Sequence, residues 1–406
     1  MRQVWKWGVG GMFMAWAATG AVAGGDLQPD TSAAAQEPGA WAARLAQGPG
    51  LEDDDGKPAI WPDESLLPRP PVLPALEQEE SVMADTPAVR GGPGGSGCRP
   101  VQASQLRFKI DNDLASGQDH GYSSGLMLEV AGQLPDDGGF PADGEGWLCP
   151  LWRLMGGGSL PRTVSFRLDQ NLYTPKNSRA RYLLTADRPY AAVLMAGVAA
   201  ERFSGGQHVR NEIRLGWVGP SVRGEASQNA VHKLINAPHF YGWDNQLGDE
   251  PLIELAQYRV RRWSLGRGSD LLGHWGARLG TLQTSAYAGM EWRFGDGLRD
   301  DGGSAPLRPG AGEPSQVLWD RSDGPRWTGF LTLGARWVGW DLTLDGNLSR
   351  DSHSVHRRPL VLDGGAGVSV QAGAWAGQLM WVLRSKEFDG QQVLPSYGAL
   401  QISYRF

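Results

Sequence analysis

Two residues with side chains suited to catalysis stand four positions apart in a short helix-forming run. Gln228 and His232 lie in residues 224–251, which read GEASQNAVHKLINAPHFYGWDNQLGDEP. Residues four apart share one face of a helix, so the amide and the imidazole can point at the same place. A neutral imidazole can take a proton from water, so general-base catalysis is the chemistry this pair would support. The alternative interpretation is a histidine on a solvated helix face.

The amino terminus predicts export from the cytoplasm. Arg2 and Lys6 precede a mostly apolar run at residues 8–18 and a small-residue cleavage pattern at residues 21–23. This order is typical of a secretory signal peptide, which we place at residues 1–23. A membrane anchor is the alternative, but the apolar run is shorter than the ~20 residues that a spanning helix needs.

Residues 24–104 differ in composition from the rest of the chain. They are rich in Pro, Gly, Ala and acidic residues, with four consecutive acids at residues 52–55. Such a composition buries too little apolar surface to offset the entropy of ordering, so we interpret the segment as a disordered extension. Cys98 and Cys149 allow one disulfide in an oxidising compartment, and the sequence does not decide their pairing. A net charge of −6, with no basic patch that has interleaved aromatic residues, argues against nucleic acid as a partner.

From residue 106 onward, apolar and polar residues alternate with a period of two. The alternating runs lie at residues 106–110, 126–130, 164–168, 213–217, 290–294, 331–337, 379–383 and 400–406. Charged residues such as Arg107 and Lys109 occupy the intervening positions. A soluble sandwich has an apolar inner face, so this pattern favours a polar lumen with an apolar outer face in lipid. The 18 Trp residues fit interfacial girdles, with a Trp-rich soluble core or sugar-binding surface as the alternative.

The alternating runs predict a closed antiparallel transmembrane β-barrel over residues 105–406. Counting all such runs from residue 106 to residue 406, beyond the eight examples above, gives about twelve strands, an even number as in bacterial barrels. The last run ends on Phe406, which resembles the assembly signal of outer-membrane barrels. With the amino terminus in the periplasm, odd-numbered strands run outward. The polar clusters expected on the outer rim are residues 111–113, 171–190 and the helix carrying His232. The count leaves long periplasmic connections at residues 132–158 and 296–325.

Six short motifs together carry a specific resemblance. IDNDLASGQDHGYSSG, QNLYTP, DRPYA, LGWVGP, QNAVH and GWDNQLGDEP occur in the order and context of the outer-membrane lipid A 3′-O-deacylase family. The likeness covers most of residues 106–406 and leaves the extension unmatched. It implies a twelve-stranded barrel that hydrolyses the ester holding the 3′ acyloxyacyl chain on lipid A, with Ca²⁺ as cofactor. Lipid A or lipopolysaccharide in the outer membrane would be the substrate, and we expect a monomer.

The resemblance also assigns roles to individual residues. The family's Asn-Asp pair falls on Asn112 and Asp113, the hydroxyl of its Tyr-Thr motif on Ser123, and its Gln and His on Gln228 and His232. His232 would be the general base, and Asp113 and Asn112 would supply the hard oxygen ligands that calcium prefers. Gln228 would orient water or the tetrahedral intermediate. Ser123, expected to face the lumen, would complete the metal or oxyanion site. Asn112 would belong both to the catalytic residues and to the metal ligands.

Each assignment has an alternative. Asn112 and Asp113 can form a simple turn, Ser123 can be an ordinary polar lumen residue, and Gln228 can be a solvated helix residue. The Glu expected six residues beyond the histidine is Pro238 here. The acids that could replace it are Glu225, Asp244 and Glu250. A family member with weakened catalysis therefore stays open, as does a passive pore or adhesin.

Two cations are expected to meet the phosphates of lipid A. Arg188 lies in the DRPY motif, and Lys233 stands beside the proposed base. Pairing of Arg188 with Asp187 or another nearby acid is an equal alternative. Trp243 and Tyr241 are expected in the interfacial belt, with acyl-chain contact as the alternative.

Overall fold

A computed structural model describes residues 102–113, 121–133, 155, 163–204, 206–235, 237–298, 303–304 and 324–406. The signal peptide, Cys98 and Cys149 lie outside these ranges, as do nearly all of the extension and most of the two long connections predicted from the sequence. The described residues belong to the compact unit Gly94–Phe406.

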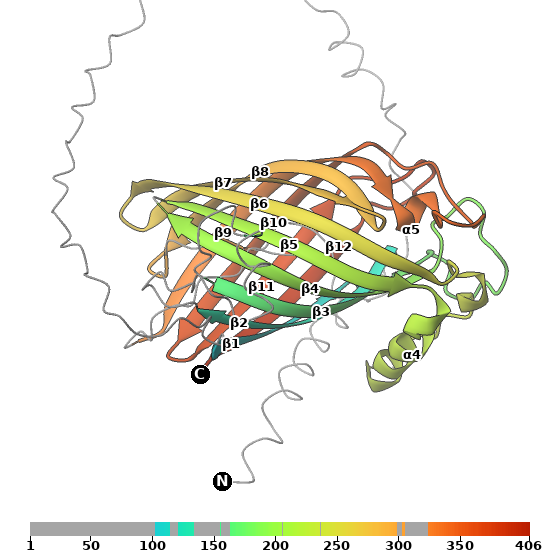
Figure 1. The fold of residues 1–406 in the computed structure, drawn as a ribbon, viewed down its shortest axis with the longest axis horizontal. Coiled ribbons are helices and arrows are strands. Elements are labelled where there is room, and N and C mark those ends of the chain that lie inside the picture. The colour runs from blue at the N-terminus through green and yellow to red at the C-terminus, as the bar shows by residue number, and fades with distance from the viewer. Residues whose placement is uncertain are drawn as a thin grey trace, which may run out of the picture. The chain divides into compact units, whose positions relative to one another are not determined.

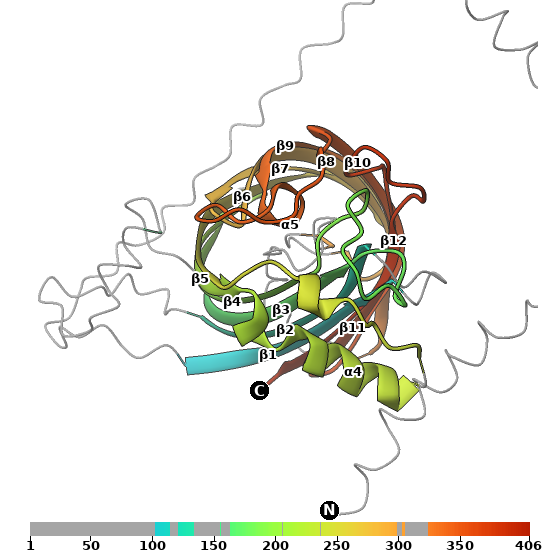
Figure 2. The same cartoon turned by 90° about the vertical axis from the view of Figure 1, so that its right-hand side faces the viewer.

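Twelve strands in the described ranges form one closed antiparallel barrel (Figures 1 and 2). They are β1 (Gln102–Asn112), β2 (Gly121–Gln133), β3 (Thr163–Thr174), β4 (Ala191–Ser204), β5 (Gln207–Val218), β6 (Glu250–Gly266), β7 (Ser269–Gly280), β8 (Gln283–Gly295), β9 (Arg326–Asp341), β10 (Leu360–Ala372), β11 (Trp375–Arg384) and β12 (Ser396–Arg405). Each strand pairs with its neighbours in sequence, and β1 closes the ring against β12, with Phe108 opposite Ile402. The predicted barrel is confirmed, with β1 starting at Gln102 rather than near residue 105. In the ranges described, no helix has the length and apolar character to cross a membrane.

Side chains along the strands separate by polarity as the alternation predicts. In β1, Arg107 and Lys109 are buried inside the barrel, whereas Phe108 between them is 41% exposed. In β2, Glu129 is buried and Leu128 is 44% exposed. An apolar outer face suits lipid, and a polar inner face needs partners of opposite charge.

Aromatic side chains on the outer face gather near both ends of the strands. Those near the rim that carries the helices are Trp217, Trp337 and Trp381, and those near the opposite rim are Trp263, Trp292, Trp327, Trp375 and Phe406. Aromatic rings favour the boundary between lipid and water, so the two groups mark the limits of an apolar band.

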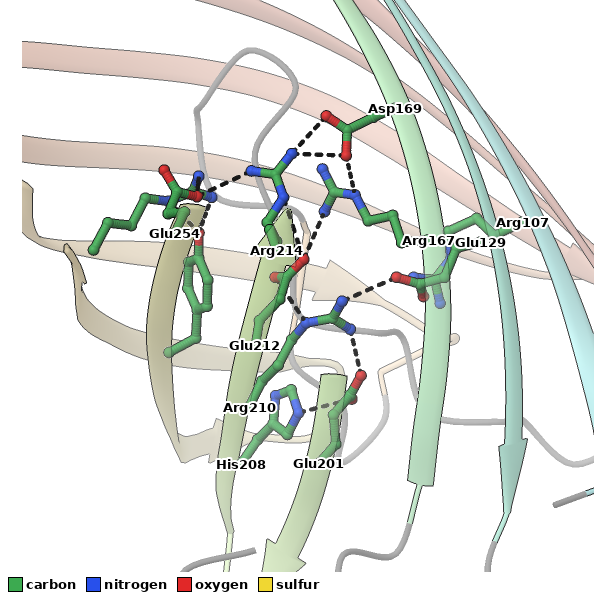
Figure 3. A network of polar contacts seen from close by, with 12 residues as sticks. Arg107, Glu129, Arg167, Asp169, Glu201, His208, Arg210, Glu212, Arg214 and Glu254 are labelled. Atoms are coloured by element: carbon green, nitrogen blue, oxygen red, sulfur yellow. Dashed lines mark hydrogen bonds and ion pairs between the residues drawn. The ribbon is translucent and has the colours of Figure 1, made fainter. Parts of the chain in front are cut away.

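Paired charges fill the interior of the barrel (Figure 3). Arg210 on β5 contacts Glu129 on β2 at 3.0 Å. Arg214 on the same strand joins Asp169 of β3 at 2.6 Å and Glu254 of β6 at 3.0 Å. All of these residues are almost completely buried. Because a buried charge is costly to leave without a partner, these contacts tie distant strands of the wall together.

The helical segments of three or more residues in the described ranges all lie at one rim of the barrel (Figures 1 and 2). After β5 the chain forms the 3₁₀ turn η4 (Pro220–Val222), the helix α4 (Gly224–Ile235) and the 3₁₀ turn η5 (Trp243–Asn245), and after β9 it forms α5 (Leu342–Asp345). Antiparallel strands alternate in direction, so β1, β3 and β5 all end at this rim. The predicted grouping of the three polar clusters on one rim is confirmed.

Loops at this rim are bonded to one another. Arg188, before β4, donates to Thr343 Oγ1 of α5 at 2.8 Å. The backbone N–H of Arg358, before β10, donates to the carbonyl of Glu387, after β11, at 2.7 Å. Figure 2 shows α5 and the segment before β4 within the outline of the ring. The rim loops therefore brace one another over a lumen that already holds paired charges.

Candidate active site

Helix α4 stands outside the barrel wall, beside the ends of β3 and β4 (Figure 2). Its first residue, Gly224, lies so close to the wall that an added Cβ would be 2.4 Å from Ala192 Cβ and 3.0 Å from a methyl group of Leu172. Ala192 lies on the outward face of β4, two positions before the exposed Leu194, yet it is fully buried. Glycine at this position therefore allows α4 to dock on the outer face of the wall.

His232 is buried on α4 and is held by the segment that follows the helix. Its Nδ1 contacts the carbonyl oxygen of Pro238, and its ring meets Phe240 edge-on with the centroids 5.7 Å apart. A carbonyl oxygen only accepts, so Nδ1 donates to it, and in the neutral imidazole the lone pair is then on Nε2. This is the tautomer that a general base acting through Nε2 requires. At the position where the resemblance expects Glu, the backbone of Pro238 orients the histidine.

Gln228, one turn before His232, is also buried. Its Oε1 accepts a hydrogen bond from the indole Nε1 of Trp243 at 2.8 Å. Its Nε2 is buried without a hydrogen-bond partner in the described structure. A buried donor left unpaired costs about 1–3 kcal/mol, which a ligand oxygen would recover. Trp243 is 2% exposed beneath α4, so the expectation that it lies in the interfacial belt is wrong.

The second half of the predicted site lies at the end of β1. Asp113 is buried, and Asn112 is partly buried. Asn112 pairs with Ser124 of β2, and Ser124 pairs with Leu172 of β3, on which α4 packs. Neighbouring strands lie about 4.8 Å apart, so roughly 10 Å separates Asn112 from the part of the wall that supports α4. The two halves of the site therefore flank the same short stretch of rim.

An irregularity in β2 brings in a residue that the sequence pattern did not reveal. The register with β3 shifts at Ser123, and Tyr122, which strict alternation would place outside, is buried. Its hydroxyl lies 3.0 Å from Asp111 Oδ2 and 3.0 Å from Asn171 Oδ1. Tyr122 thus joins β1 to β3 close to the Asn-Asp pair. The sequence signal is the break in alternation just before Gly125, where an added Cβ would lie 1.8 Å from the tyrosine oxygen. The side chain of Ser123 lies outside the described part, and its role stays a prediction.

Comparison with known proteins identifies the family of this barrel. The model of the family described as outer membrane protein LpxR matches residues 78–406. The chain belongs to the LpxR family. This is the lipid A deacylase family that the six motifs resemble, and membership places the barrel in the outer membrane with its apolar band in lipid.

The likeness to a solved LpxR structure supports the fold. LpxR from Salmonella typhimurium is 19% identical with a TM-score of 0.59, and the match covers 75% of this chain and 100% of that chain. The β domain of the Bordetella autotransporter BrkA is 11% identical with a TM-score of 0.39, covering 75% and 99%. No sequence among the curated proteins matches the chain.

The donors predicted for calcium are of the right chemical type. The carboxylate of Asp113 and the amide oxygen of Asn112 are hard ligands, which suit Ca²⁺. They supply two donors where the ion takes six to eight, and the described ranges contain no group of three His, Cys, Asp or Glu residues arranged to hold a metal. A calcium ion at this pair would therefore depend on water or substrate oxygens for much of its coordination.

The acids that could replace the missing family Glu differ in their surroundings. Glu250 is buried, and its carboxylate accepts from Asn347 Nδ2 at 3.1 Å and from Ser349 Oγ at 2.9 Å. It therefore fastens the segment after α5 to β6. Glu225 and Asp244 are both exposed and remain open as metal ligands.

Arg188 is buried at the rim, and its guanidinium is engaged on three sides. Nη1 lies 3.4 Å from Glu387, Nη2 donates to Thr343, and the group stacks 4.7 Å from the ring centroid of Tyr173. The pairing with a nearby acid is thus the contact observed, with Glu387 rather than Asp187 as the partner. Its assignment to a lipid A phosphate stays a prediction, and a phosphate would have to compete with Glu387.

Lys233, the second predicted phosphate ligand, is exposed on α4. The sequence pattern did not reveal three further exposed cations in the segment after β3, which are Lys176, Arg179 and Arg181. The guanidinium of Arg181 lies 5.1 Å from the ring centroid of Tyr241, and the backbone N–H of Tyr241 donates to the carbonyl of Ser178 at 2.9 Å. This basic segment therefore contacts the loop that follows α4. Its signal was the run KNSRAR directly after the QNLYTP motif.

Proposed function

We propose that the chain is a calcium-dependent lipid A 3′-O-deacylase, which hydrolyses the ester that holds the 3′ acyloxyacyl chain. The observation that carries the proposal is the setting of His232. A buried imidazole held through Nδ1 by the Pro238 carbonyl, one helical turn from a buried amide donor on Gln228, has the arrangement of a general base beside an oxyanion donor. A histidine on a solvated helix face would have neither the burial nor the fixed tautomer.

The reaction follows from these groups. Nε2 of His232 takes a proton from a water molecule, whose oxygen attacks the carbonyl carbon of the 3′ ester. The oxyanion that forms accepts a hydrogen bond from Nε2 of Gln228. The bond between the carbonyl carbon and the 3′ oxygen then breaks, and His232 returns its proton to that oxygen. The products are a free acyloxyacyl carboxylic acid and a 3′ hydroxyl on lipid A.

The acidic end of β1 has a supporting role in this proposal. Asp113 and Asn112 would hold the calcium ion, which supplies Lewis-acid polarisation of the ester carbonyl when bound. Ser123 is predicted to supply a further hydroxyl there. Tyr122 holds the underlying strands together through Asp111 and Asn171.

The position of the site supports a membrane lipid as substrate. Helix α4 docks on the outer face of the wall at the edge of the apolar band, where the headgroup and acyl chains of a lipid meet. Lys233 and the basic segment after β3 are exposed near this helix, and exposed cations attract phosphate groups. Paired charges in the lumen and bonded rim loops count against a passive pore. A family member with weakened catalysis is the second candidate, favoured by Pro238 in place of the family Glu.

The test is analysis of lipid A by mass spectrometry from an outer-membrane host that produces the wild type or His232→Ala, together with assays of the purified proteins with calcium and with a chelator. The wild type is expected to remove the 3′ acyloxyacyl group, and chelation or His232→Ala to prevent removal. An intact 3′ group with correctly inserted wild type would reject the hydrolase. Removal of the 3′ acyloxyacyl group by His232→Ala would reject His232 as the general base.

A further inference from the structure

The indole of Trp243 decides which end of the Gln228 amide faces away from it. An indole N–H can only donate, so the amide atom 2.8 Å from it must be the oxygen Oε1. The reverse orientation would set two donors against each other. The placement of Nε2 on the opposite side of the amide therefore follows from hydrogen-bond chemistry, which removes the usual ambiguity between the two ends of a glutamine.

The Trp243 ring is itself held in place by close packing. It is buried in one cluster with Phe240 and Tyr190, and its centroid lies 5.1 Å from that of Tyr190. A Cβ added to Gly224 would lie 3.0 Å from the edge of the indole. At Gly242, just before Trp243, an added Cβ would lie 2.7 Å from the Tyr190 ring. The indole therefore has little room to turn away from Gln228.

Together, the two side chains on α4 offer complementary groups on one helix face. In its neutral form His232 has its lone pair on Nε2, because Nδ1 donates to the Pro238 carbonyl. Gln228 has a buried Nε2 donor with no partner in the described structure. Ester hydrolysis needs one acceptor for the proton of water and one donor for the carbonyl oxygen that becomes negative. With its acceptor end taken by Trp243, Gln228 is equipped for the second task and not for accepting a hydrogen bond from the attacking water.

We infer that Trp243 is a positioning residue that turns the Gln228 amide so that its NH₂ group donates to the oxyanion. The inference rests on the proposed function and deepens it. It also selects between the two roles that the sequence left open for Gln228, which were orienting water and stabilising the tetrahedral intermediate.

The test compares kcat and KM on purified lipid A for two variants. Trp243→Phe keeps an aromatic ring and loses only the N–H that orients the amide. Gln228→Glu keeps an acceptor for that N–H and replaces the NH₂ donor with oxygen. Both are expected to lower kcat by about 100-fold with KM changed less than about two-fold, because an oxyanion donor acts in the transition state.

Controls separate positioning from packing. Trp340→Phe loses an indole bond of the same length, 2.8 Å to the carbonyl of Thr281, away from α4, and is expected to keep the wild-type kcat. Trp243→Phe added to Gln228→Ala is expected to cause no further loss, because the tryptophan acts through the amide. Thermal unfolding checks that each variant is folded.

Three results would overturn the inference: a wild-type kcat in Trp243→Phe, losses that multiply in the double variant, or a wild-type kcat in Gln228→Glu. If Trp243→Phe does not fold, Gln228→Glu decides, since it leaves the indole contact in place. An inactive wild type would instead reject the proposed function.

Discussion

Two buried histidines of this barrel stand in opposite surroundings. His208, inside the lumen on β5, contacts Glu201 Oε2 at 3.0 Å and stacks in parallel on Phe203 at 4.2 Å. His232, outside the wall on α4, contacts the neutral carbonyl of Pro238. In the lumen an imidazole meets a buried carboxylate, and the pair acts as a structural link between strands. On α4 a neutral carbonyl holds one end of the ring, and in the proposed mechanism the other end takes the proton.

The same contrast extends to the neighbours of each histidine. Arg210 in the lumen lies between Glu201, at 2.5 Å, and Glu129, at 3.0 Å, so three strands share one cluster of charges (Figure 3). Gln228 on α4 has its oxygen bonded to Trp243 and its nitrogen buried without a partner in the described structure. The lumen is built to hold the wall together, whereas the helix outside it retains a donor that a substrate can use.

The largest expected effect tests this contrast directly by changing each histidine to glutamine. His232→Gln is expected to lower kcat by about 10²–10⁴-fold, because the general base is removed. His208→Gln is expected to keep kcat and to lower the thermal unfolding temperature, because it weakens a structural pair. Deacylation assays and thermal melts of both variants check this. Equal losses of activity would contradict the division between the two regions.

The next effect is one of stability. Arg210→Leu leaves Glu129 and Glu201 buried without their shared cation, which is expected to cost about 3–5 kcal/mol. The activity of the fraction that stays folded is expected to be unchanged. Equilibrium unfolding in detergent measures the cost. Arg267→Leu, in the exposed turn between β6 and β7, is the matched control, with an expected change within about 0.5 kcal/mol.

Two cations of the rim are expected to differ in the same way, because one acts on substrate binding and the other on stability. Lys233→Ala removes an exposed charge, so KM for phosphorylated lipid A is expected to rise roughly two- to five-fold, with a smaller rise in high salt. Arg188→Ala removes one of the two buried arginines that contact Glu387 and is expected to lower the unfolding temperature more than it changes KM. Steady-state kinetics on lipid A with and without its phosphates decide between them. If the change in KM for Lys233→Ala is the same on lipid A with and without its phosphates, Lys233 is not part of the substrate site.

The smallest effect concerns acid. Burial acts to raise the pKa of Glu387, but Arg384 and Arg188 outweigh it and hold that pKa below its usual range. A carboxyl with a lowered pKa stabilises the fold fully above its unfolded pKa of about 4.3, and this contribution is lost as pH falls through the lowered value. Protection of the rim loops against hydrogen exchange is therefore expected to fall below about pH 4. Glu387→Gln, which cannot titrate, should lack this step, and an unchanged step would assign it to another group.

The sequence by itself determined the barrel and the rim on which the predicted site residues lie. Alternation with a period of two separates lipid-facing from lumen-facing residues, and the antiparallel order brings the ends of β1, β3 and β5 to one rim. The helical period likewise placed Gln228 and His232 on one face of α4. These features follow from local geometry and strand direction, which a single chain carries without reference to distant contacts.

Only the tertiary structure decided what each polar group contacts. Pro238 orients His232 through its backbone, where a side chain was expected, and Trp243 orients Gln228 across 15 residues of chain. Arg188 finds Glu387 across 199 residues instead of its neighbour in sequence. Closure of the ring and docking of α4 on its outer face bring these segments together, and a local period does not record which distant segments meet.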